Sequence, residues 1–250
     1  MAKIVPIGAE EDFIVFAKKN YIVLSVVGSL VTFAILVYLI GRCRNREGNN
    51  FVMFNFLLIC YDIAFDIAFF IKNANDVPGL YRLTLIILIA SGSLNLLMSF
   101  AIIVHQKIYN PAFSNWFSEN HRFAALITVF SAANIQALKI FSSNYGGMNI
   151  LQAKYSTIGK RAIAWGGVLN LASQDIPQLV ILVIYWTKTE GYMIFPFISL
   201  IFNVVILFID FFGRIFDAII IKNDDDGTTR RLNDRSSEST YQYSMRVGAP

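Results

Sequence analysis

Two aspartates in an otherwise apolar stretch are the residues of this sequence best suited to chemistry. Asp62 and Asp66 lie four residues apart in LICYDIAFDIAFFIKN, residues 58–73. In an α-helix this spacing places both carboxyl groups on one face. A pair of this kind could bind a cation, relay a proton or offer a polar path to a lipid headgroup. All three of these roles require that the stretch crosses a membrane.

Further polar side chains recur at helical spacing in the later apolar runs. Asn95 lies midway between Ser91 and Ser99, a ridge of the kind that joins helices in lipid. We predict an intramembrane polar track made of Asp62, Asp66, Asn95, Asn134, Lys139, Asn170, Gln174, Asp175 and Gln178. Pro177 has no backbone N–H, so we predict a helix kink there.

Lys139 is the one candidate cation of this track, and it has two interpretations. It lies near the end of an apolar run, where its side chain can extend to the lipid headgroups. Alternatively, it is the counter-ion of a buried aspartate.

The composition indicates a membrane protein. The chain has 250 residues, of which 56% are hydrophobic and 15% charged, whereas a soluble domain carries about 25% charged residues. Its apolar residues come in runs near 20 residues long, which suffice for a helix to cross a ~30 Å hydrocarbon core. In lipid the backbone must satisfy its own hydrogen bonds, so these runs predict helices. We therefore expect an all-α fold, a polytopic bundle of transmembrane helices.

We predict about six transmembrane helices, although five or seven spans also fit the sequence. The expected spans are residues 21–40, 51–71, 80–104, 122–141, 161–186 and 192–212. Residues 1–20 form an N-terminal segment, residues 21–222 the helical bundle and residues 223–250 a polar tail. The tail is low in aliphatic residues and rich in Ser, Thr and charge, which predicts disorder.

The positive-inside rule favours a cytosolic location for both termini if six helices cross. Thirteen basic residues then share the side of the termini and six lie on the other side. One loop conflicts with this orientation, because it packs Arg42, Arg44 and Arg46 into a short connection on the opposite side. An odd number of spans would remove the conflict. The membrane is the plasma membrane or an endomembrane.

The cost of the two acids predicts that they face other helices. Residues 51–71 contain 13 Leu, Ile, Phe or Val residues, which together favour insertion by roughly 4–8 kcal/mol. Two charged aspartates near the bilayer centre cost roughly 5–7 kcal/mol. Because these terms nearly cancel, the helix is stable only if Asp62 and Asp66 are protonated, paired or turned toward the bundle interior.

The sequence gives little support to an enzyme. It contains no HExxH, GxSxG, P-loop or paired CxxC string, and His105 and His121 have no acid or cysteine at metal-ligand spacing. We therefore expect no catalytic residues, no metal and no cofactor. The net charge of +4 suits anionic lipid headgroups and indicates no nucleic-acid partner. The expected partners are membrane lipids, with a cation or a lipid as a possible substrate.

Three strings carry a resemblance to known membrane proteins. YDIAFDIAFFIKN, NIQALKIFSSNYGG and WGGVLNLASQDIPQLVILVIY resemble a group of uncharacterised multi-pass proteins from fungi and protists, in which an acid–Ile–Pro–Gln step recurs in a late span. The chain is also faintly similar to the XK-related proteins, some of which scramble phospholipids, in its early-span acids and its later acid followed by Pro-Gln-Leu.

The resemblance covers residues 51–190 in pattern and implies lipid translocation. The matching positions are Asp62, Asp66, Asp175, Pro177 and Gln178. The XK-related proteins have more spans than the six expected here, and they typically carry a second Gln where this chain has Leu182.

Two hypotheses on function follow. The first is a transport-class protein that moves a lipid, a cation or a proton along the acidic intramembrane track. The second is a membrane receptor or scaffold that does not transport and signals through its polar tail.

Overall fold

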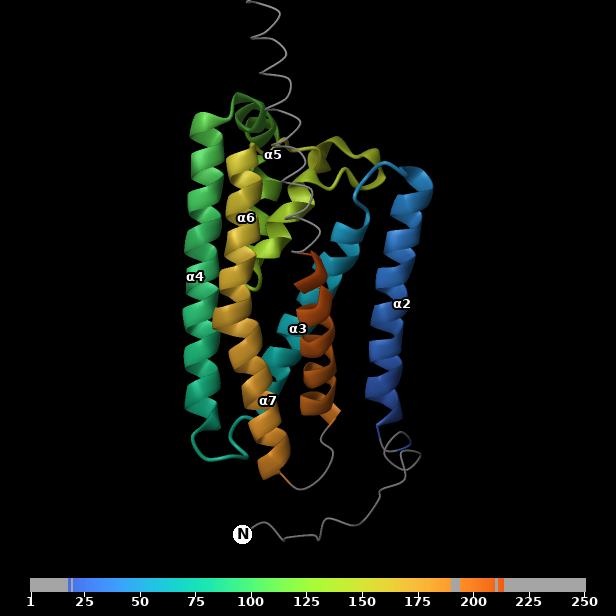
Figure 1. Cartoon of the computed structure of the whole chain (residues 1–250). Helices are drawn as coiled ribbons and strands as arrows, with labels where there is room; N and C mark the ends of the chain where they lie inside the picture. The colour runs from blue at the N-terminus through green and yellow to red at the C-terminus, as the bar shows by residue number, and fades with distance from the viewer. Residues whose placement is uncertain (1–17, 19, 190–193, 210, 214–250) are drawn as a thin grey trace, which may run out of the picture. The chain divides into compact units, whose positions relative to one another are not determined.

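The structure is a computed structural model that describes residues 18, 20–189, 194–209 and 211–213 (Figure 1). These residues are helices and short connections, without a strand among them, so the predicted all-α fold is confirmed. The chain divides into two compact units, one ending at Asp210 and the other starting at Phe211. The predicted tail, residues 223–250, and nearly all of the predicted N-terminal segment, residues 1–20, lie outside the described residues.

Five helices in the described ranges are long and apolar enough to cross a membrane. They are α2 (Tyr21–Arg44), α3 (Phe51–Lys72), α4 (Leu80–Tyr109), a composite helix (Thr157–Lys188) and a C-terminal span (Ile194–Gly213) in which Asp210 is not described. The shortest has 20 residues, which is about 30 Å at a rise of 1.5 Å per residue. This length matches the hydrocarbon core and supports the predicted membrane bundle.

The composite helix has three parts. They are α6 (Thr157–Asn170), the π-helical turn η4 (Leu171–Asp175) and α7 (Ile176–Lys188). Pro177 lies at the start of α7, directly after the π-helical turn. A proline cannot donate a backbone hydrogen bond, and a π-turn is one way in which a helix changes its bonding pattern. The π-helical turn therefore ends two residues before Pro177, and the helix kink at Pro177 stays a prediction.

The prediction of a sixth span over residues 122–141 is wrong. The structure has instead α5 (Pro111–Phe130), a turn, and the 3₁₀-helix η1 (Ile135–Ser142). Two short 3₁₀ turns follow, η2 (Tyr145–Gly147) and η3 (Asn149–Leu151). α5 is as long as the shortest span, but its backbone leaves helical geometry at Asn120, and it is not among the described helices that are apolar enough to cross.

Local side-chain caps explain where these helices begin. The Asn110 side chain accepts a hydrogen bond from the Phe113 backbone N–H at 3.3 Å, and Pro111 occupies the first turn of α5. Asn at the N-cap and Pro at the first helical position both favour helix initiation. Asn134 caps η1 in the same way, by accepting from the Gln136 N–H at 2.9 Å.

Residues 111–156 form a re-entrant hairpin, which enters the bundle and leaves it at the same end. It starts beside the end of α4, and its turn reaches the middle of α4, where Asn95 Nδ2 donates to the Ala132 carbonyl at 3.3 Å. It ends where Gln106, near the end of α4, bonds Ser156. In Figure 1 the hairpin (green to yellow) descends beside α6 and returns to the same end.

The end of the bundle that holds both ends of the hairpin is called the hairpin end. There Gln106 Nε2 donates to Ser156 Oγ at 2.8 Å, and the Ser156 N–H donates to Gln106 Oε1 at 2.9 Å. The Tyr145 hydroxyl donates to the Val37 carbonyl of α2 at 2.6 Å. These bonds attach the base of the hairpin to α4 and α2.

Apolar packing encloses most of η1, although Leu126, Val129 and Phe130 of α5 are exposed. Phe113 of α5 and Phe141 of η1 have no exposed surface, and the Trp116 ring lies 5.1 Å from the Phe141 ring. Ile135 of η1 approaches Gly166 of α6, where only the lack of a side chain leaves room for it. Non-helical backbone is tolerated at membrane depth only when protein or water surrounds it, and here protein does.

A substitution at Gly41 tests the packing of the hairpin base against α2. A Cβ atom at Gly41 would overlap the Tyr145 ring and lie 2.7 Å from Asn50 Oδ1. The ring cannot retreat without losing the Tyr145–Val37 hydrogen bond. We expect Gly41→Ala to lower the free energy of unfolding by about 1–3 kcal/mol, the usual cost of overpacking, in thermal unfolding of the purified protein. Gly28→Ala is the control, since nothing lies within 4 Å of Gly28, and a Gly28→Ala loss of the same size would contradict this account.

Cysteine labelling tests the topology. The variants Ser118→Cys, Gln152→Cys and Asn75→Cys place exposed thiols before the hairpin turn, after it, and in the loop between α3 and α4. In a background with both native cysteines changed to Ser, a membrane-impermeant maleimide should label positions 118 and 152 from one side and position 75 from the other. A true span at residues 122–141 would instead separate 118 from 152 and place 152 with 75.

Candidate functional site

The polar residues of four spans gather at the middle of the bundle. Asp62, Asn95 and Asn203 each lie near the central residue of their helix. Most of their partners are buried, with 0% exposure for Asp66, Asn95 and Asn170. The prediction that these side chains face other helices is therefore consistent with the structure, and a deep polar core is typical of functional sites in membranes.

One group of these side chains centres on Asp66 of α3. Ser199 Oγ donates to Asp66 Oδ1 at 2.8 Å, and Asn203 Nδ2 lies 3.4 Å from the same oxygen. Asn203 Nδ2 also donates to Asp62 Oδ1 at 3.2 Å. One amide of the C-terminal span thus bridges the two acids of α3. We call Asp62, Asp66, Ser199 and Asn203 the acid group.

The second carboxylate oxygen of Asp66 faces α7. The Gln178 side chain interacts with the Asp66 carboxyl, yet neither Asp66 Oδ2 nor Gln178 Nε2 has a partner at hydrogen-bonding geometry. The partners of Asp66 are Ser199, Asn203 and Gln178, all of them neutral. Neutral partners satisfy hydrogen bonds of a carboxylate but do not offset the burial of its charge.

A second group centres on Asn95 of α4. Asn95 Nδ2 lies 2.5 Å from Asn170 Oδ1, 3.2 Å from Gln174 Oε1 and 3.3 Å from the Ala132 carbonyl oxygen. Asn170 Nδ2 in turn donates to Asp175 Oδ1 at 3.0 Å. The group joins α4, the composite helix and the hairpin turn. We call Asn95, Ala132, Asn170, Gln174 and Asp175 the amide group.

The composite helix connects the two groups. Asp175 and Gln178 are three residues apart, so their side chains lie on one face of the helix. Asp175 belongs to the amide group, whereas Gln178 contacts Asp66 of the acid group. Polar side chains therefore follow one another from Asp62 through the bundle to the hairpin turn.

The structure brings together seven of the nine predicted track residues in these two groups and the Gln178 link. The other two lie in the hairpin: Asn134 is buried at the start of η1, and Lys139 is half-buried within η1. The role of Lys139 as a counter-ion stays a prediction.

The predicted track did not include Ser199 and Asn203. They lie four residues apart in the last apolar run, which is the spacing that identified Asp62 and Asp66. The same criterion applied to ISLIFN would have found them.

The chemistry of the two groups is that of oxygen ligands and exchangeable protons. Carboxylates, carboxamide oxygens and one backbone carbonyl are the groups that bind hard cations. Within the part of the chain that the structure describes, no three His, Cys, Asp or Glu side chains are placed to hold a metal ion. The arrangement suits a proton or a monovalent cation better than a divalent one.

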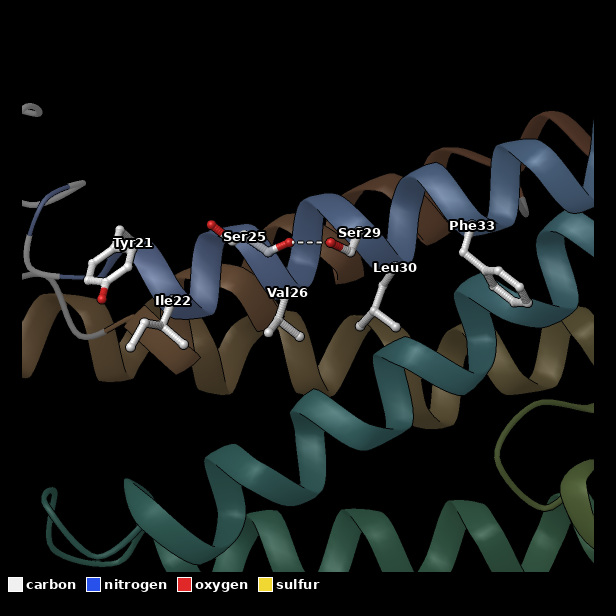
Figure 2. Close-up of a pocket in the computed structure, with 7 residues that line it drawn as sticks. All are labelled: Tyr21, Ile22, Ser25, Val26, Ser29, Leu30 and Phe33. Carbon is white, nitrogen blue, oxygen red and sulfur yellow. Dashed lines mark hydrogen bonds between the residues drawn. The ribbon is translucent and has the colours of Figure 1, made fainter.

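A shallow groove lies on α2, away from this polar core. Figure 2 shows the side chains that line it: Tyr21, Ile22, Ser25, Val26, Ser29, Leu30 and Phe33. Its two serines offer little to a ligand, since Ser29 Oγ donates to the Ser25 carbonyl of its own helix at 2.8 Å. The groove is a mostly apolar surface suited to acyl chains.

Comparisons of the chain with protein-family models, with curated proteins and with solved structures found no match. The resemblance to XK-related proteins therefore stays a prediction.

A double-mutant cycle tests the amide group. Asn95→Ala and Asn170→Ala each remove one partner of a buried hydrogen bond, so we expect each to lower the stability of the protein. The double variant should lose less than the sum, with a coupling of about 0.6–1.7 kcal/mol, as measured for bonds inside membrane bundles. Unfolding in mild detergent measures the effect, and Asn115→Ala at an exposed position is the control. Strict additivity would mean that the two amides do not meet.

Proposed function

We propose that this chain is a transport-class membrane protein that moves protons or small cations through its polar core. The observation that carries the proposal is Asp66, which has 0% exposure, accepts hydrogen bonds from neutral side chains and lies in a sequence of polar groups drawn from four spans. Hydrogen bonding between helices alone would not require an acid, since Asn or Ser provides it without the cost of burying a charge.

Enclosure of the core favours a small ion over a lipid. A phospholipid headgroup needs a path open to the side, whereas Asp66, Asn95 and Asn170 are fully buried. Asp62 is half-buried, and the groove on α2 is mostly apolar. Lipid translocation, which the resemblance to XK-related proteins implies, therefore has less support from the geometry.

The receptor or scaffold alternative places function in the polar tail, residues 223–250. That segment lies outside the described residues, so this alternative stays a prediction.

The charge distribution supports an orientation that differs from the one expected for six spans. Of the described residues, eight basic ones lie at the hairpin end (Arg42, Arg44, Arg46, Lys107, Arg122, Lys154, Lys160 and Arg161) and four at the opposite end (Lys18, Lys72, Arg82 and Lys188). The positive-inside rule then assigns the hairpin end to the cytosol. With five spans the chain would enter and leave the membrane on opposite sides, which replaces the expectation of two cytosolic termini and removes the conflict at the Arg42–Arg46 loop.

A flux measurement tests the proposed function. Purified protein is reconstituted into liposomes, and proton, Na⁺ and K⁺ flux are recorded beside the movement of a fluorescent phospholipid. We expect ion or proton flux in the intact protein. The isosteric change Asp66→Asn should reduce this flux about tenfold or more, because it removes the fully buried carboxyl of the acid group, which can exchange a proton or neutralise a cation.

Glu119→Gln is the matched control, since it makes the same change from acid to amide at an exposed position. It should leave the flux unaltered. Absence of every ion flux, or an equal flux in Asp66→Asn, would contradict the proposal. Lipid movement that depends on Asp66 would instead support the lipid hypothesis.

A further inference from the structure

The amide group contains more acceptors than its central donor can satisfy. Three oxygen atoms lie 2.5–3.3 Å from Asn95 Nδ2, one each from Asn170, Gln174 and the Ala132 backbone. An NH₂ group has only two hydrogens. The oxygens thus converge on one point as ligands converge on a cation.

Two buried oxygens of α4 have no hydrogen-bond partner among the described residues. Asn95 Oδ1 is one, and Ser99 Oγ, one helical turn further along α4, is the other. Both residues have 0% exposure. A buried oxygen without a donor loses free energy relative to water, so an unpaired oxygen beside a cluster of acceptors indicates a missing positive partner.

Two interrupted helices meet at the same place. α5 ends at Phe130, just before Ala132, so the negative end of its helix dipole lies at the depth of Asn95. The π-helical turn η4 carries Gln174 and Asp175. Interrupted helices with carbonyl oxygens at mid-membrane depth are a recurring way to coordinate Na⁺ in transporters.

We propose that the amide group is a binding site for a dehydrated monovalent alkali cation, of which Na⁺ is the probe. The ligands are Asn170 Oδ1, Gln174 Oε1, the Ala132 carbonyl oxygen and Asn95 Oδ1. The ion takes the place that Asn95 Nδ2 holds in the structure, and rotation of the Asn95 side chain moves Nδ2 away and turns Oδ1 toward the ion. Asp175, bonded to Asn170, supplies the negative charge.

The composition of the site selects the class of ion. Ca²⁺ and Mg²⁺ sites usually hold several carboxylates or retained waters, whereas the amide group has a single carboxylate and neutral oxygens. Neutral carboxamide and carbonyl oxygens do not take up a proton near neutral pH, but they replace the hydration shell of an alkali ion. A monovalent cation therefore matches both the charge and the ligand type.

This inference deepens the proposed function, on which it rests for its role in transport, but binding is measurable without flux. The full-length protein is reconstituted into nanodiscs, and its thermal unfolding is followed in NaCl, KCl, LiCl and choline chloride at equal ionic strength. An ion that binds the folded state raises Tm in a concentration-dependent way. We expect an alkali cation to raise Tm above the value in choline chloride.

Substitutions at the proposed cation site are compared with a matched substitution outside it. Asp175→Asn keeps the volume of the side chain and should weaken the apparent Na⁺ affinity at least about tenfold, because a bond to a charged group is lost. Glu119→Gln, the same change from acid to amide at an exposed position, should retain the Na⁺-dependent shift. Asn95→Leu, which removes a ligand without leaving a cavity, gives a second measurement if Asp175→Asn fails to fold.

Each outcome bears on one claim. Equal Tm in all four salts, or the same salt response in the intact protein and both site variants, would overturn the site. A Na⁺-dependent shift without ion flux would leave the site standing and remove the proposed function. Proton flux that depends on Asp66, without a shift of Tm by an alkali ion, would support the proposed function and remove the cation site.

Discussion

The structure depends on the absence of water in the hydrocarbon core, which obliges every polar group there to find its partner within the protein. The hairpin turn is the severest case, because its backbone leaves the helix at the depth of Asn95. Asn95 meets this need by donating to the Ala132 carbonyl, while the base of the hairpin is held by Gln106 and Tyr145. Packing against the apolar rings Phe113, Trp116 and Phe141 buries most of η1.

The same constraint gathers the acids. A carboxyl group that faced the acyl chains would offset most of the insertion free energy of its helix. In the structure Asp66 accepts from Ser199 and lies beside Asn203, and Asp175 accepts from Asn170. Each acid thus accepts a hydrogen bond from an uncharged side chain, Asp66 from the C-terminal span and Asp175 from its own composite helix. Such donors satisfy hydrogen bonds but do not neutralise charge, and the proposed movement of an ion or a proton rests on this property.

Much of this arrangement could be predicted from local patterns. Apolar run length identified five of the spans closely, and i, i+4 spacing placed Asp62 with Asp66 on an inward face. The hairpin could not be predicted in the same way. Residues 122–141 read as one apolar run without Gly or Pro, and the helix ends at Phe130 because contacts with α4, distant in sequence, satisfy the turn. The partners of Asp66 in the last span likewise depend on which helices become neighbours.

The depth of the hairpin turn is the central claim, and a cross-link measures it most directly. The Ala132 carbonyl oxygen lies 3.7 Å from the position of a Cβ at Gly92, in the middle of α4. With Cys43 and Cys60 changed to Ser, the double variant Gly92→Cys/Ala132→Cys should form an intramolecular disulfide under mild oxidation, whereas pairing Ala132→Cys with Val104→Cys near the end of α4 should not. Efficient cross-linking to position 104 and none to position 92 would show that the hairpin stays at the membrane surface and would contradict the account.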